Sequence, residues 1–174
     1  CFRQVADIVK NVKGNCMVVV SAMGGKPKTT DLLLNAVAAA AQRNTDEVER
    51  LLQLVWEKHE TCIGDLLGSD HALLATIRSD MRNIRDILKT VSLMKWQATR
   101  IAELVAGHGE TWSAQVLAQH LGYTYLDARQ VIVVQEDDNN NFTVEWKESQ
   151  RRLNAILPTS SHFCMTGYIC VNTE

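Results

Sequence analysis

The sequence predicts an α/β fold in which a mainly parallel sheet is flanked by helices and the chain makes a long helical insertion. The Val-rich run at residues 16–21 is typical of a strand buried on both faces of a parallel sheet. Further strand-like stretches at 123–126, 131–134 and 162–171 alternate with helical patterns. Residues of about 44–105 show helical periodicity only, which indicates the insertion.

Composition limits the possible partners and the environment. The 174 residues are 46% hydrophobic and 22% charged, as in one globular domain. The net charge of −2 gives no electrostatic basis for binding nucleic acid or an anionic membrane. No apolar run approaches the roughly 18–20 residues that a transmembrane helix needs. The five cysteines are odd in number and scattered, which favours a reducing compartment over a disulfide framework.

The first third of the chain reads as helix, strand, loop and helix. Residues 2–12 resemble the end of an amphipathic helix, and the strand at 16–21 follows. Pro27 prevents regular structure from continuing through the loop at 23–28. Thr29 or Thr30 then caps a helix to about residue 43 that is apolar on all sides, so we expect it to be packed on several sides.

Two helices are predicted in the insertion. Asn44 caps the first, which ends at Gly68. The second extends from about residue 70 to 105, with apolar residues at alternating steps of three and four, so the two could form an antiparallel hairpin. After it we expect a helix from Glu110 to about residue 121, another at 145–157, and a last strand at 162–171.

A glycine loop after the first strand is the first candidate site. Ser21 ends the strand, and Gly24 and Gly25 allow backbone N–H groups to approach anionic oxygens. The spacing is not that of a Walker P-loop, and on spacing alone an ordinary turn is favoured.

The segment Gly107-His108-Gly109-Glu110 is the second candidate site. We expect it to join two helices, which places Glu110 in the first turn of the second one. A carboxylate there can complement the helix dipole or bind a substrate ammonium group. Scattered pairs such as His59 with Cys62 lack a second pair at zinc-binding distance, so no metal ligands are predicted.

Taken together, these motifs resemble the amino-acid kinase family, and most of all the aspartate kinases of the plant bifunctional type. The segments 3–9, 56–59, 126–129 and 166–169 also fit, so the resemblance covers almost the whole chain. It implies transfer of the ATP γ-phosphate to the β-carboxylate of L-aspartate, with ATP and Mg²⁺ as cofactors. By position in the family motifs, it implies that Thr30, Glu110 and Tyr168 bind substrate, with Thr29 as the alternative to Thr30 because the loop is about two residues longer than in many members. Ser21, Gly24 and Gly25 would bind the nucleotide, and no catalytic residue is assigned.

The sequence also departs from the family pattern. It lacks the opening Lys-Phe-Gly-Gly strand, and the segment Thr166-Gly167-Tyr168 is not followed by the Gly-Ser-Asp loop that these kinases have there. We therefore interpret residues 1–174 as a partial kinase domain without the first strand and the nucleotide-binding half, inactive alone. The parent enzyme is expected to be a homo-oligomer in the cytoplasm or a plastid. The alternatives are another amino-acid kinase, such as a glutamate or acetylglutamate kinase, or a non-catalytic oligomerisation module.

Overall fold

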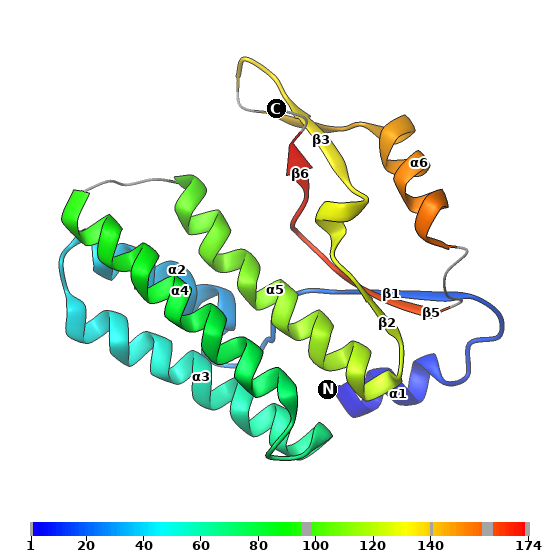
Figure 1. Ribbon diagram of the computed structural model, residues 1–174, viewed down its shortest axis with the longest axis horizontal. Coiled ribbons are helices and arrows are strands. Elements are labelled where there is room, and N and C mark those ends of the chain that lie inside the picture. Colours follow the sequence, from blue (N-terminus) through cyan, green and yellow to red (C-terminus); the bar gives the residue numbers. More distant parts are fainter. Residues whose placement is uncertain (1, 95–98, 140, 158–161, 173–174) are drawn as a thin grey trace.

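The computed structural model describes residues 2–94, 99–139, 141–157 and 162–172, and it has the predicted α/β architecture (Figure 1). The helices are α1 (Phe2–Val9), α2 (Thr29–Ala41), α3 (Thr45–Leu67), α4 (Ala72–Met94), α5 (Thr99–Leu121) and α6 (Trp146–Ile156), with a 3-10 turn η1 (Ala128–Gln130). The strands are β1 (Cys16–Val20), β2 (Thr124–Leu126), β3 (Val133–Glu136), β4 (Phe142–Val144), β5 (His162–Thr166) and β6 (Val171–Asn172).

The main sheet is parallel, as predicted. Its order is β1-β5-β2, and both neighbours of β5 run parallel to it. α1 and α5 pack on one face, where Ala114, Leu117 and Cys164 are buried together. Leu153 and Ile156 of α6 pack near Phe163 on the other face. The sheet is therefore a layer between helices, with the carboxyl ends of its strands directed to one edge.

A second, smaller sheet has the order β4-β3-β6. β3 is antiparallel to β4 and parallel to β6. The stretch 162–171, expected as one strand, is thus two strands in different sheets, separated by the bend at residues 167–170. Tyr168 has a positive φ of 61°, which turns the chain between the two sheets.

The helical block packs around α2. This helix contacts α3, α4 and α5, which explains why its sequence is apolar all round. Asn44 caps α3 as predicted, accepting a hydrogen bond from the backbone N–H of Glu47. The buried residues Ile77, Met81 and Ile84 of α4 lie in the same core as Leu52 and Val55 of α3, and α3 and α4 lie side by side (Figure 1).

The predicted helix boundaries around the second motif were wrong. α4 ends at Met94, and α5 continues without interruption from Thr99 through Gly107-His108-Gly109 to Leu121. Residues 95–98, which the prediction included in one long helix, lie outside the described residues. Glu110 is therefore in the middle of α5 rather than in a first turn, and the helix-dipole interpretation does not apply to it.

Candidate functional site

Glu110 and Ser21 meet across Gly167, where two parallel strands end. Ser21 follows β1 and Gly167 follows β5, and the Gly167 N–H donates to the Val20 carbonyl at 2.7 Å. A Cβ atom placed on Gly167 would lie 3.5 Å from both Glu110 Oε2 and Ser21 Oγ, and 3.2 Å from the Val20 carbonyl oxygen. The absence of a side chain at Gly167 therefore lets the two polar groups approach the same point.

The Glu110 carboxylate is buried without a cation. Only 5% of the residue is exposed, and Oε2 is a buried atom with no hydrogen-bond partner among the described residues. Burial raises the pKa of Glu110, while a hydrogen bond from the Ala22 backbone opposes that rise. A ligand ammonium group would supply the missing partner and the missing positive charge.

Glycines in α5 make this close arrangement possible. A Cβ on Gly109 would lie 3.0 Å from the Ala22 Cβ and 3.2 Å from Cγ2 of Thr29. Helix interiors normally disfavour glycine, but here it allows α5 to touch the loop after β1 and the start of α2. The glycines that suggested a loop in the sequence are therefore packing residues.

The two threonines at the start of α2 differ in their surroundings. Thr29 is fully buried, and its Oγ1 has no hydrogen-bond partner among the described residues. Thr30 is half-buried, next to it in the first turn. The structure thus places Thr29 against α5, and the substrate-binding role of Thr30 stays a prediction.

Lys58 is a further charged residue at this site, and no role was predicted for it from the sequence. Its Nζ donates to the Pro27 carbonyl at 2.7 Å, and a Cβ on Gly25 would lie 3.5 Å from Nζ. Burial lowers the pKa of Lys58. The residue therefore reaches from α3 to the glycine loop. In the sequence, the only indication of a role for Lys58 was its place in the 56–59 segment of the family resemblance.

A His–Trp–Asp group, in which His59 and Trp112 are buried and Asp80 is half-buried, lies on a further side of α5. His59 is fully buried, hydrogen-bonds through Nδ1 to the Val55 carbonyl at 2.7 Å, and meets Trp112 edge-on. Trp112 Nε1 donates to Asp80 Oδ2 at 2.9 Å. Burial lowers the pKa of His59 to about 4, so this histidine is neutral at physiological pH. The group connects α3, α4 and α5 and is structural.

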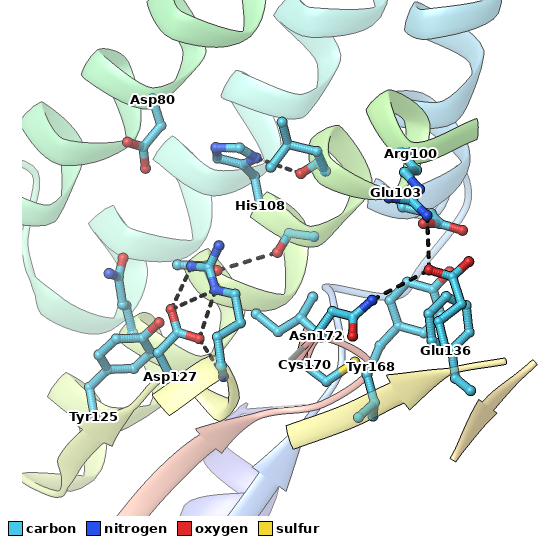
Figure 2. A pocket seen from close by; sticks show the side chains of 18 of the residues that line it. Asp80, Arg100, Glu103, His108, Tyr125, Asp127, Glu136, Tyr168, Cys170 and Asn172 are labelled. Carbon is cyan, nitrogen blue, oxygen red and sulfur yellow. Dashed lines mark hydrogen bonds and ion pairs between the residues drawn. The ribbon is translucent and has the colours of Figure 1, made fainter. Parts of the chain in front are cut away.

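A pocket of about 760 Å³ opens beside the other face of α5 (Figure 2). Gly107, His108 and Thr111 of α5 line it, but Glu110 and Ser21 do not. Tyr168, which is 73% exposed, also lines the pocket. The predicted substrate residues are therefore distributed over two places, with Glu110 on one side of the 167–170 segment and the Tyr168 ring on the pocket side.

Two arginines of this pocket are held by neighbouring carboxylates. Arg100 pairs with Glu136 at 2.8 Å. Arg129 donates from Nε to Asp127 Oδ1 at 3.0 Å, a local ion pair between neighbouring residues. Figure 2 shows Asp127 at one position along the pocket and Arg100 with Glu136 at another. Each guanidinium thus has a carboxylate partner within the pocket.

The structure adds three observations about other classes of site. The described residues contain no group of three or more His, Cys, Asp or Glu side chains that could hold a metal ion. None of the helices in the described part of the chain is long and apolar enough to cross a membrane. Cys16, Cys62, Cys164 and Cys170 are free thiols.

The chain is similar to plant bifunctional enzymes. No protein-family model matches it. It is 34% identical to the bifunctional aspartokinase/homoserine dehydrogenase 1, chloroplastic, of Arabidopsis thaliana, over 94% of this chain and 19% of that protein. The Zea mays bifunctional aspartokinase/homoserine dehydrogenase 1, chloroplastic, is also 34% identical, over 87% of this chain and 17% of its own length.

Solved aspartate kinases have the same fold. The Clostridium acetobutylicum aspartate kinase matches 99% of this chain and 36% of its own, with a TM-score of 0.76 and 20% identity. Escherichia coli aspartokinase III in complex with aspartate and ADP matches 99% of this chain and 38% of its own, with a TM-score of 0.69 and 17% identity.

The fold of the chain is that of the solved aspartate kinases. Within that class, the chain is a homologue of the plant bifunctional aspartokinase/homoserine dehydrogenases. It spans 19% of the length of the Arabidopsis relatives.

Proposed function

We propose that the chain forms the amino-acid-binding part of an aspartate kinase, which transfers the γ-phosphate of ATP to the β-carboxylate of L-aspartate. The observation that carries this proposal is the Glu110 carboxylate, buried without a cation and facing Ser21 across Gly167. Ligands of α/β proteins bind beyond the carboxyl ends of parallel strands, which is where this pair lies.

The proposed site residues divide into those that bind the amino acid and those that face the phosphates. Glu110 accepts hydrogen bonds from the substrate ammonium group. Thr30 completes the amino-acid side of the site, whereas the Tyr168 ring lies on the pocket side of the 167–170 segment. Ser21 and the backbone N–H groups at Gly24 and Gly25 face the phosphates, and the Lys58 bond to the Pro27 carbonyl positions this loop. Phosphoryl transfer depends mainly on positioning and charge neutralisation, so groups that the fold holds in place contribute directly to rate.

ATP is the proposed phosphate donor, and the ADP in the Escherichia coli aspartokinase III structure supports it. Mg²⁺ would neutralise the phosphates when bound. The described residues offer no carboxylate group of three to hold it, so its protein ligands are proposed to come from outside this segment. Most residues of the nucleotide site are likewise proposed to come from outside this segment, because the chain spans only 19% of the length of its Arabidopsis relative.

Further expectations belong to the same proposal. Residues 1–174 are a partial kinase domain, and the helical block of about 44–105 is its insertion. We expect the segment alone to be inactive, the complete enzyme to be a homo-oligomer, and the protein to act in a plastid, as the names of the chloroplastic relatives suggest. Aspartate-dependent ADP release by the purified 174-residue chain would contradict the first of these expectations.

The test of the proposal is Glu110→Gln in a complete enzyme that contains this chain. Glutamine keeps the size of the side chain but removes the charge that binds an ammonium group. Loss of one charge-assisted hydrogen bond costs about 1.5–3 kcal/mol. We therefore expect kcat/KM for aspartate to fall roughly ten- to 150-fold, with little change in KM for ATP.

The matched control is Glu145→Gln, which changes the same group at the start of α6, where the side chain makes no cap hydrogen bond. Its kinetics should equal those of the unmodified enzyme. Unchanged aspartate kinetics for Glu110→Gln, or an equal loss for aspartate and ATP, would reject the role of Glu110.

A further inference from the structure

We propose that the pocket beside α5 is a second ligand site and that it binds a small organic cation with an apolar body. The site is separate from Glu110, because the segment after β5 crosses α5 between them. A Cβ on Gly107 would lie 3.0 Å from Cγ2 of Ile169, so the two segments touch and leave no passage at that point. The proposal does not depend on the proposed kinase activity.

The charges of the pocket favour a cation. Four carboxylates line it, from Asp80, Glu103, Asp127 and Glu136. The only lining guanidinium groups are those of Arg100 and Arg129, and each is paired with one of the four. Asp80 and Glu103 form no ion pair among the described residues, which leaves the pocket with uncompensated negative charge. An anionic ligand would meet this excess of negative charge, and both guanidinium groups already have carboxylate partners.

The hydrogen-bonding groups point to the same ligand class. Arg100, Arg129 and the Asn172 amide nitrogen already donate to carboxylates of the pocket. Two amide acceptors are unused, because Gln115 Oε1 and Asn172 Oδ1 are buried without a partner among the described residues, and the Tyr125 hydroxyl, also without one, can accept as well as donate. Asp80 accepts from Trp112 through Oδ2, and no described residue donates to its Oδ1. A ligand rich in N–H donors would satisfy these atoms.

The walls and the size indicate an organic cation rather than a metal ion. Leu104, Phe142, Tyr168 and Ile169 contribute apolar surface, and the exposed rings of Phe142 and Tyr168 can also contact a cation through their faces. The volume of about 760 Å³ lies within the usual range of small-molecule sites, about 300–1,000 Å³. Asp80 and Glu103 lie apart in the pocket, not around one point (Figure 2).

The experiment titrates the ¹⁵N-labelled 174-residue chain with three probes of one shape: benzylammonium, benzyl alcohol and benzoate. The Trp112 indole N–H, which is bonded to Asp80, reports on the pocket in the NMR spectrum. We expect saturable shifts of this signal and of the residues around the pocket with benzylammonium, at least tenfold weaker binding of benzyl alcohol, and none of benzoate. Equal binding of the three probes, or no saturable binding of benzylammonium, would overturn the proposal.

Charge-removing variants locate the site. Asp80→Asn should weaken benzylammonium binding roughly tenfold, and the more exposed Glu103→Gln about threefold. The control Asp86→Asn removes an exposed carboxylate from the same helix as Asp80 but outside the pocket, and it should leave the affinity unchanged. If Asp80→Asn disturbs folding through Trp112, Glu103→Gln alone decides. Equal effects of Glu103→Gln and Asp86→Asn would mean that the cation binds elsewhere.

Discussion

The carboxylates on the two faces of α5 differ in whether they have a cationic partner. On the closed face, Glu110 is buried without a cation, and glycines bring the surrounding segments into contact. On the open face, Asp127 and Glu136 have arginine partners beside a pocket of about 760 Å³. One helix therefore carries a buried carboxylate without a cation on one side and lines a pocket with charged residues on the other. The comparison shows that close packing, and not helix position, gives Glu110 its unusual environment.

The largest expected effect concerns the third side of α5, where His59 meets Trp112. Burial lowers the pKa of His59 to about 4 from an ordinary 6.5. The unfolded chain therefore takes up a proton before the folded chain does, and the free energy of unfolding falls by about 3 kcal/mol as the pH drops from 6.5 to 4. Urea unfolding at several pH values should show this slope, and His59→Phe should reduce it.

The control is His120→Phe at the end of α5, which should keep the slope of the unmodified chain. The same slope in the His59→Phe variant would show that other groups cause the acid sensitivity.

Glycine substitutions test the closed face directly. Gly109→Ala places a Cβ 3.0 Å from the Ala22 Cβ, so we expect a loss of about 1–3 kcal/mol in unfolding free energy. Gly64→Ala in α3 meets only Ser69 Oγ at 3.7 Å, and here alanine should stabilise by about 0.5–1 kcal/mol. Denaturant unfolding measures both. A gain in stability for Gly109→Ala would mean that α5 does not need the close approach.

Lys58→Met should have a smaller effect. It removes the hydrogen bond to the Pro27 carbonyl, which we expect to cost about 1 kcal/mol of unfolding free energy. Hydrogen exchange should also become faster at the amides of residues 24–28. Lys89→Met, at an exposed position of α4, is the control. If the two variants behave alike, Lys58 does not position the loop.

The smallest predicted effect is on the unliganded stability of Glu110→Gln. Burial raises the pKa of Glu110, so its contribution to stability is complete at low pH and is lost as the pH rises through the folded-state pKa. Glutamine should therefore make the free chain more stable at neutral pH and change little at low pH. The pH dependence of stability due to Glu110 is therefore opposite in sign to that due to His59. A variant less stable than the unmodified chain at neutral pH would argue that the charged carboxylate is structurally required.

The sequence predicted the parallel sheet and the helical hairpin because both depend on local patterns. The Val-rich run of β1 and the stripe of α4 require only that their apolar faces be buried. It did not predict the continuity of α5, because Gly107 and Gly109 read as local breaks, whereas in the fold they permit contacts with Ile169, Ala22 and Thr29. Those contacts join segments far apart in the chain.

The candidate site could be predicted only in part. Ser21 and Glu110 were singled out from the sequence, but their approach to the same point at Gly167 depends on tertiary structure. The second pocket could not be found from the sequence, since its lining residues come from α4, α5 and several strands and form no motif.

The central claim is that Glu110 is a buried carboxylate prepared for a substrate ammonium group, and one NMR titration tests it most directly. The chain is labelled with ¹³C at the glutamate side-chain carboxyl groups, and the Glu110→Gln variant identifies the Glu110 signal. The pH titration is recorded for the free chain, with saturating L-aspartate, and with succinate, which lacks the ammonium group. The pKa of Glu110 should lie above its ordinary value in the free chain, fall when L-aspartate is present, and stay unchanged with succinate. No response to L-aspartate, or the same response to succinate, would contradict the account.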